Sequence, residues 1–220
     1  MPQGYLILTL HAHLPFVRHP ENEDYLEEQW LFEAITETYF PLLQVFDRLQ
    51  ADNIPYPITL SLSPSLLSML ADPLLQQRYL KYLDLRLELL EKEKLRTQGT
   101  VFAEVSAMYR HKLQEIRRLF TEVYQGNLIQ AFRKHQHQLN LITCAATHGF
   151  LPFLSHNPAC VKAQIGLAVD CHQRLLGQKV WTAFCLNFAC DSVFWKPTGF
   201  CLAVPVRPGE FMPRFSVPTE

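Results

Sequence analysis

The sequence has no surplus of either charge and no long apolar run. Its 220 residues carry 20 lysines and arginines against 21 aspartates and glutamates, a net charge of -1. There is no basic excess to neutralise phosphates, so nucleic acid is not expected as a partner. No apolar stretch approaches the roughly 20 residues that a helix needs to cross a bilayer, and the first apolar run has no basic leader. We therefore expect a cytoplasmic protein without a membrane partner.

Several enzyme motifs are also missing. No G-x-G-x-x-G or Walker sequence is present, which removes the main sequence support for dinucleotide and nucleotide chemistry. Ser61 and Ser63 lie outside any G-x-S-x-G setting, so a hydrolase nucleophile elbow is not supported. The six cysteines form no C-x-x-C pair, and reduced, buried thiols are the expectation.

Three short apolar segments are predicted to be strands. Each is followed by a loop or a helical pattern, and alternation of this kind is typical of a parallel α/β fold. The carboxyl ends of parallel strands lie at one edge of the sheet, where α/β proteins usually place their chemistry. The predicted strands are 5–13, 58–62 and 139–145, and the polar residues at their ends are His11 and His13, Ser61 and Ser63, and Thr147 and His148.

Apolar residues at three- and four-residue steps predict the helices between and after these strands. Pro41 should bend or restart the first helix, Ser63 or Ser65 should cap the second, and Gly177 should end the last. A fourth strand is expected within "VWTAFCLNFAC", followed by an irregular tail that holds five of the fifteen prolines. The predicted helices are 27–50, a short one after residue 63, 73–97, 101–132 and 158–176.

The His-x-His pair is the strongest chemical signal. Side chains two apart in a strand point to the same side, so His11 and His13 should lie together. Imidazoles are common zinc or iron ligands, but a closed metal site normally takes four ligands, and further ligands are not evident; no metal is predicted. Neutral imidazoles can instead bond sugar hydroxyls. A strand-end histidine can also simply fill space.

Aromatic and acidic residues lie in the first predicted helix, 27–50, which follows the His-x-His pair in the sequence. Trp30 lies near Glu33 and Glu37, and rings beside carboxylates are typical of carbohydrate sites. Helix aromatics are also common core residues, and Glu33 with Glu37 is an ordinary i,i+4 pair.

Four segments together resemble the N-terminal part of glycoside hydrolase family 57, in particular its 1,4-α-glucan branching enzymes. They are "GYLILTLHAHLPFVRHPE", "EEQWLFEAITETYFPLL", "LITCAATHGFLPFL" and "AQIGLAVDCHQRLLG". The resemblance spans about residues 4–177 and implies an incomplete (β/α)7 barrel with a long helical insertion over 1–177 and a divergent tail over 178–220. It implies that His11, His13, Trp30 and His148 bind an α-glucan such as amylose, glycogen or a maltooligosaccharide, without cofactor or metal.

The resemblance also implies a reaction. Branching enzymes of this type cleave an α-1,4 link and rejoin the chain through an α-1,6 link with retention, which needs two carboxyl groups roughly 5 to 5.5 Å apart. The family nucleophile is a glutamate in a W-L-P-E type motif on the fourth strand. The corresponding stretch here is "VWTAFCLNFACDSVFW", with no glutamate between Asp170 and Glu210, and Asp191 is the only acidic residue nearby.

The aspartate that would serve as acid/base is expected beyond residue 220, so no catalytic residue is predicted. The prediction is therefore a family member truncated by a shifted reading frame or early stop and inactive as this chain. One alternative is a glucan-binding or regulatory remnant. The other is a metal-dependent hydrolase or deacetylase that uses the H-x-H motif.

Overall fold

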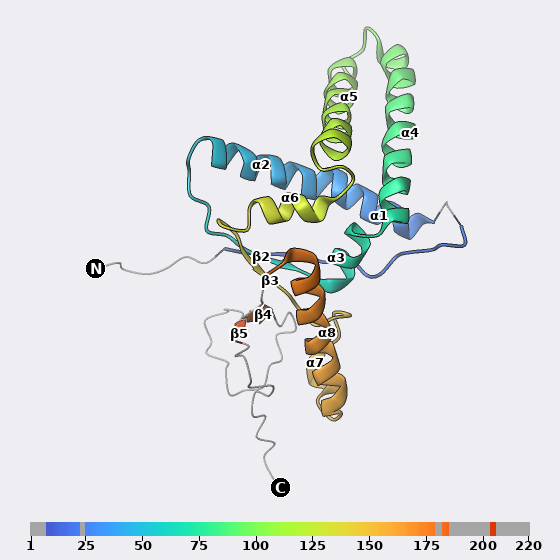
Figure 1. The fold of residues 1–220 in the computed structure, drawn as a ribbon. Helices are drawn as coiled ribbons and strands as arrows, with labels where there is room; N and C mark the ends of the chain where they lie inside the picture. The colour runs from blue at the N-terminus through green and yellow to red at the C-terminus, as the bar shows by residue number, and fades with distance from the viewer. Residues whose placement is uncertain (1–7, 23–24, 179–181, 185–202, 206–220) are drawn as a thin grey trace. The chain divides into compact units, whose positions relative to one another are not determined.

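The computed structural model describes residues 8–22, 25–178, 182–184 and 203–205 (Figure 1). The chain divides into two compact units, and it passes back and forth between them. Unit 1 contains the described strands, and unit 2 consists of helices and their connections. Unit 1 comprises Met1–Pro15, Pro57–Leu67 and Leu139–Glu220, and unit 2 comprises Phe16–Tyr56 and Ser68–Gln138.

Unit 1 contains a parallel three-stranded sheet in the order β1-β2-β3. Its strands are β1 (Thr9–Ala12), β2 (Thr59–Leu62) and β3 (Asn140–Ile142). Each lies inside a predicted strand, although the predicted strands are longer. The α/β class with a parallel sheet is thus confirmed.

The strand register places His11 beside Ser61 and Ala12 beside Leu62. Neighbouring residues in register point to the same face of a sheet, so His11 and Ser61 share one face and Ala12 and Leu62 the other. Leu60, Ser61 and Leu62 are all buried. The central strand β2 is therefore covered on both faces, as expected for a parallel sheet.

The helix after β2 begins where the sequence indicates. α3 (Pro64–Leu70) follows Ser63, whose Oγ accepts a hydrogen bond from the Leu66 N–H at 3.3 Å. Pro64 suits the first helical position because its missing N–H needs no partner there. The prediction that Ser63 or Ser65 caps this helix is confirmed for Ser63.

Two helices of unit 1 follow β3. The first, α7 (Leu151–Leu154), is short. The second, α8 (Pro158–Leu176), begins at the predicted proline and ends at Gly177, which has a φ of 74°. Residues other than glycine rarely adopt such a backbone conformation, and Gly177 therefore fixes the end of the helix.

The first helices of unit 2 form the run predicted for residues 27–50. It comprises α1 (Leu26–Ala34), the π-helical turn η1 (Ile35–Tyr39) and α2 (Phe40–Ala51). Pro41 lacks an N–H, and its ring would clash with the carbonyl of residue 37 in a regular α-helix. The wider π turn just before Pro41 accommodates this proline, so the helical run continues through Pro41 without a break.

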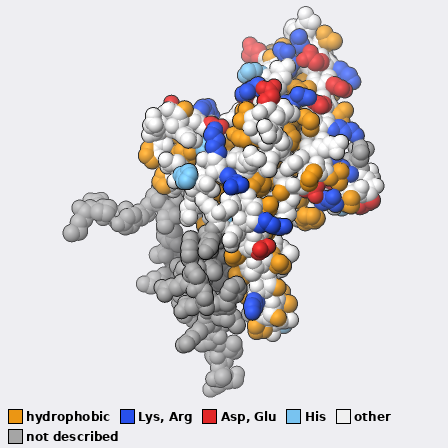
Figure 2. Space-filling view, in the orientation of Figure 1, with side chains coloured by type: hydrophobic (Ala, Val, Ile, Leu, Met, Phe, Trp, Pro, Cys, Tyr) orange, Lys and Arg blue, Asp and Glu red, His pale blue; other side chains and the backbone are white. Residues whose placement is uncertain are grey.

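The predicted helix over 73–97 is confirmed as α4 (Pro73–Thr97). The Asp72 side chain caps it by accepting hydrogen bonds from Leu74 N–H and Leu75 N–H. α4 lies beside α5 (Ala103–Arg118) in Figure 1. Figure 2 shows acidic and basic side chains interspersed over this helical pair.

The predicted single helix over 101–132 is wrong. After α5 the chain makes a π turn, η2 (Leu119–Val123), and a break precedes α6 (Leu128–Lys134). In that break Gln125 and Gly126 have φ values of 49° and 79°. Asn127 then caps α6 by accepting from the Ile129 N–H. Gly126 and Asn127 are turn-forming residues, and they override the helical spacing of the apolar residues around them.

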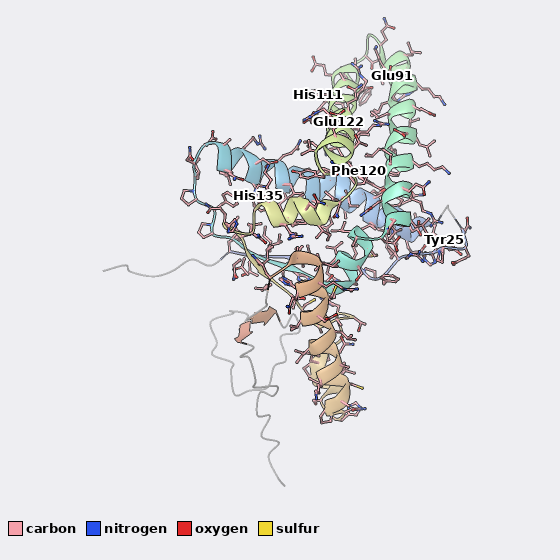
Figure 3. All side chains as sticks on the ribbon, in the orientation of Figure 1. Tyr25, Glu91, His111, Phe120, Glu122 and His135 are labelled. Atoms are coloured by element: carbon pink, nitrogen blue, oxygen red, sulfur yellow. The ribbon has the colours of Figure 1, made fainter. Side chains whose placement is uncertain are left out.

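Aromatic rings fill the core of unit 2. The Phe120 ring (Figure 3) meets Tyr79 edge to face at 4.9 Å between centroids. Phe40 lies against the same two residues. Such edge-to-face pairs add to the stabilisation that burial alone provides.

The predicted fourth strand is confirmed only as a short segment. β4 (Thr182–Phe184) pairs antiparallel with β5 (Ala203–Pro205) and does not extend the parallel sheet. The prediction of irregular chain is wrong for β5, and the rest of the tail, including Asp191, lies outside the described residues. None of the helices that the structure describes is long and apolar enough to cross a membrane.

Candidate functional site

The three predicted histidines meet at one edge of the sheet in unit 1. His11 lies in β1, His13 follows that strand, and His148 comes from the loop after β3. The His13 and His148 rings are stacked, with centroids 3.9 Å apart and planes 14° from parallel. His11 lies 5.4 Å from His148 and 6.0 Å from His13. Parallel pairing thus brings together side chains that are 135 positions apart in the numbering.

The loop after β3 holds His148 in an unusual backbone conformation. Its φ is 57°, in a region that few residues other than glycine adopt. The His148 N–H donates to the Ala145 carbonyl at 2.9 Å. Local strain of this kind is maintained only where the surroundings hold the chain firmly.

Gln164 of α8 supplies much of that support, and the sequence analysis missed it. Its Oε1 accepts from the Thr147 N–H at 2.9 Å, and its Nε2 donates to Thr147 Oγ1 at 2.8 Å. Its carbonyl accepts from the Ala146 N–H at 3.1 Å. A lone glutamine on a helix carries no motif, so no sequence signal could have identified this role.

Two serines connect β2 and α3 to the histidines. Ser63 Oγ lies 2.9 Å from His13 Nδ1 and 3.2 Å from Ser65 Oγ. Ser65 Oγ donates to the Leu14 carbonyl at 2.9 Å. The fully buried Ser61 Oγ has no hydrogen-bond partner among the residues that the structure describes. The predicted polar strand ends therefore do converge at this edge of the sheet.

The histidines are uncharged at neutral pH. Burial, followed by the nearby His148 and His13 rings, lowers the pKa of His11 to about 4. Burial and His148 likewise lower the pKa of His13 to about 4. Burial also lowers the pKa of His148. Each ring is therefore a neutral group with one N–H donor and one nitrogen acceptor.

This arrangement suits hydroxyl groups better than a metal ion. The lone pairs of an imidazole lie in the plane of the ring. The lone pairs of two stacked rings therefore point in parallel planes and do not converge on one position, as a metal ion would require. Within the described part of the chain, no group of three or more His, Cys, Asp or Glu side chains has the geometry to hold a metal. Neutral imidazoles, each with one donor and one acceptor nitrogen, can form hydrogen bonds with hydroxyl groups.

Trp30 belongs to unit 2, whereas the histidines belong to unit 1. It lies on α1 with 45% of its surface exposed, so it is not a core residue of that helix. Its role in sugar binding stays a prediction.

Two of the carboxylates near Trp30 have structural partners. Glu28 is buried and receives the Arg78 guanidinium at 2.7 Å and the His19 N–H at 2.8 Å. Glu37 pairs with Lys112. Both carboxylates are thus engaged in holding unit 2 together.

A model of a known protein family matches most of this chain. The model for glycosyl hydrolase family 57 matches residues 7–188, and the chain belongs to that family. The match extends past Gly177 and ends before the proline-rich part of the tail.

Among its relatives, a 1,4-alpha-glucan branching enzyme from Thermococcus kodakarensis is 32% identical over 190 residues, covering 83% of this chain and 27% of that protein. The structure is also similar to the alpha-amylase AmyC of Thermotoga maritima, with a TM-score of 0.76 and 38% identity over 80% of this chain and 34% of that one. A branching enzyme of the same family from Pyrococcus horikoshii gives a TM-score of 0.75 and 29% identity over 82% of this chain and 34% of that one. The chain thus spans about a third or less of these relatives.

Proposed function

We propose that unit 1 binds an α-1,4-glucan chain through His11, His13 and His148. The observation that carries this proposal is the stack of neutral imidazoles at the carboxyl edge of a parallel sheet. Family membership supports it, since relatives of this chain are named as a branching enzyme and an alpha-amylase. Neutral rings can hydrogen-bond sugar hydroxyls without attracting competing ions.

The sheet is proposed to be the first part of a (β/α)7 barrel. The order β1-β2-β3 with parallel pairing is what consecutive barrel strands require. In such a barrel the histidine edge would face the substrate. Trp30 of α1 is proposed to contribute an aromatic face for the sugar ring, since 45% of its surface is exposed.

The site is proposed to derive from an enzyme that transfers α-glucan chains from α-1,4 to α-1,6 positions. The identity to branching enzymes over most of this chain supports that origin. Hydrolysis of the same polymer is the second candidate, favoured by the 38% identity to an alpha-amylase. Both reactions require a carboxylate nucleophile if they proceed with retention.

The 220-residue polypeptide itself is proposed not to carry out either reaction. No glutamate lies between Asp170 and Glu210, where the family's nucleophile is expected. Histidines that bind sugar hydroxyls do not replace the covalent step, because each tenfold in rate requires about 1.4 kcal/mol of transition-state stabilisation.

Calorimetric titration with maltoheptaose tests the binding proposal. We expect saturable heat from the wild-type chain, and His13→Ala should weaken binding about three- to tenfold, the value of one or two net hydrogen bonds. His111→Ala is the matched control, because His111 is an exposed histidine on α5 in unit 2 (Figure 3). Absence of binding, or equal weakening in both variants, would contradict the proposal.

A further inference from the structure

We propose that Ser63 and Ser65 fix the tautomer of His13, so that its Nδ1 carries the proton and its Nε2 offers a bare lone pair to the ligand. The relevant atoms form one connected set of contacts: His13 Nδ1 to Ser63 Oγ at 2.9 Å and to Ser65 Oγ at 3.4 Å, Ser63 Oγ to Ser65 Oγ at 3.2 Å, and Ser65 Oγ to the Leu14 carbonyl at 2.9 Å. All four residues belong to unit 1. The inference rests on the proposed function and specifies which ligand groups His13 accepts.

The direction of the chain follows from its last contact. A carbonyl oxygen only accepts hydrogen bonds, so the single Ser65 hydroxyl proton is used on Leu14. Ser65 must therefore accept at its contact with Ser63, and the Ser63 proton points to Ser65. Ser63 is then left to accept from His13.

Counting protons gives the same answer. The serine hydroxyls supply two protons, which serve the contacts from Ser65 to Leu14 and from Ser63 to Ser65. The two contacts of His13 Nδ1, with Ser63 Oγ and Ser65 Oγ, then share the N–H at Nδ1. If His13 carried its proton on Nε2, two protons would serve four contacts, and at least two contacts would set lone pair against lone pair.

The remaining hydrogen bond at Ser63 agrees with this assignment. The Leu66 N–H also donates to Ser63 Oγ, at 3.3 Å. A hydroxyl oxygen has two lone pairs, so it can accept from both His13 and Leu66 while donating to Ser65. The one donor and both acceptor positions of the Ser63 hydroxyl are then occupied, and its oxygen accepts from both the Leu66 N–H and His13.

The consequence is a preference at the site. Nε2 lies on the opposite side of the imidazole from Nδ1, and with the proton on Nδ1 it can only accept. His13 is thus set to receive a hydroxyl proton from a neutral sugar and to disfavour a carboxylate or phosphate oxygen, which brings no proton. Ser63 and Ser65 act through His13 and are positioning residues.

Nitrogen NMR on the ligand-free chain tests the tautomer directly. Long-range proton–nitrogen correlations of ¹⁵N-labelled protein at pH 7 distinguish a protonated nitrogen from a bare one, and the His13 signals are identified by their loss in His13→Gln. We expect His13 Nδ1 to be protonated in the wild type. A protonated Nε2 and a bare Nδ1 would overturn the inference.

The variant Ser65→Ala provides the decisive comparison. Without the Ser65 oxygen, the Ser63 proton is free to turn to His13 Nδ1, and the histidine proton should move to Nε2. Ser155→Ala is the matched control, because Ser155 likewise donates to a backbone carbonyl, that of Pro152 at 2.7 Å, and lies exposed in the same unit. It should leave the His13 signals unchanged, and an unchanged tautomer in Ser65→Ala would contradict the role of Ser65.

Titration with maltoheptaose separates this inference from the proposed function. Ser65→Ala should weaken binding about three- to tenfold, since one acceptor becomes a donor. If the wild-type chain binds no glucan but shows the expected tautomers, the proposed function fails and the proton assignment stands. If glucan binds but the tautomers are reversed, the proton assignment alone fails.

Discussion

At the residue scale, the charge of His11, His13 and His148 depends on their burial and on their distance from one another. His11, His13 and His148 lie within 6.0 Å of one another by ring centroid. Protonating one of them would require charging a ring that is partly withdrawn from water and close to two others. Their low pKa values therefore affect stability as well as recognition.

We predict that acid destabilises the protein before its carboxylates titrate. The pKa of His11 and His13 is about 4 in the folded state, against about 6.5 in an unfolded chain. As pH falls from 7 to 5, the unfolded state binds protons that the folded state does not, so the free energy of unfolding should fall. Urea denaturation across this range measures the slope, and His11→Gln with His13→Gln should make it shallower. An unchanged slope would contradict the low pKa values.

A buried ion pair gives the second prediction at this scale. Glu28 and Arg78 are 1% and 8% exposed and are joined at 2.7 and 2.8 Å. Glu28→Gln leaves the Arg78 charge buried without its counter-ion, and the free energy of unfolding should fall by about 3–5 kcal/mol. Glu115→Gln, which removes an ion pair with Arg118 on the surface of α5, should cost less than about 1 kcal/mol. Similar losses in the two variants would contradict the difference in burial.

Single capping residues mark where the helices α4, α6 and α8 begin. Asp72, Asn127 and Asn157 each accept backbone N–H bonds at the first turn of a helix. These N–H groups have no partner within the helix itself. The bounds of α4 could be predicted from Pro73 and the leucine spacing, whereas the break before α6 depended on a turn that interrupts the same spacing.

We predict that Asp72→Ala destabilises unit 2 more than Asp84→Ala does. Both residues pair with an arginine at 2.6 Å, Asp72 with Arg18 and Asp84 with Arg117. Only Asp72 also caps α4, by accepting from Leu74 and Leu75. Loss of the cap should cost about 1 kcal/mol beyond the loss of the ion pair, as measured by urea denaturation. Equal costs would show that the cap contributes little.

For the whole molecule, the question is which part of a family 57 reaction this chain can support. It covers 27–34% of the length of the relatives compared above, and its two units interleave along the sequence. The proposed binding residues from β1 and from the loop after β3 are present in unit 1. The proposed activity therefore divides into binding, which we assign to these residues, and bond cleavage, for which no glutamate is present between Asp170 and Glu210.

We predict that the purified chain binds maltooligosaccharides without changing amylose. The iodine stain of amylose should keep its colour and intensity after incubation with the protein, and debranching should release no new short chains. An intact family 57 branching enzyme, assayed in parallel, serves as the positive control. A change in the stain that follows the added protein would contradict the proposed lack of catalysis.

The sequence by itself determined the class of the fold, the three parallel strands, most of the helices and the residues of the histidine site. Apolar residues at every second position predict strands, and the histidines and serines at the ends of these runs place polar groups at the strand ends. Pro64, Pro73, Pro158 and Gly177 mark helix bounds, because the backbone preferences of proline and glycine are local. The tertiary structure decided what depends on contacts between distant segments. The stacking of His13 on His148, the low pKa values, the support from Gln164 and the serine chain to His13 all arise when separate strands and helices meet, and no local pattern in the sequence encodes them.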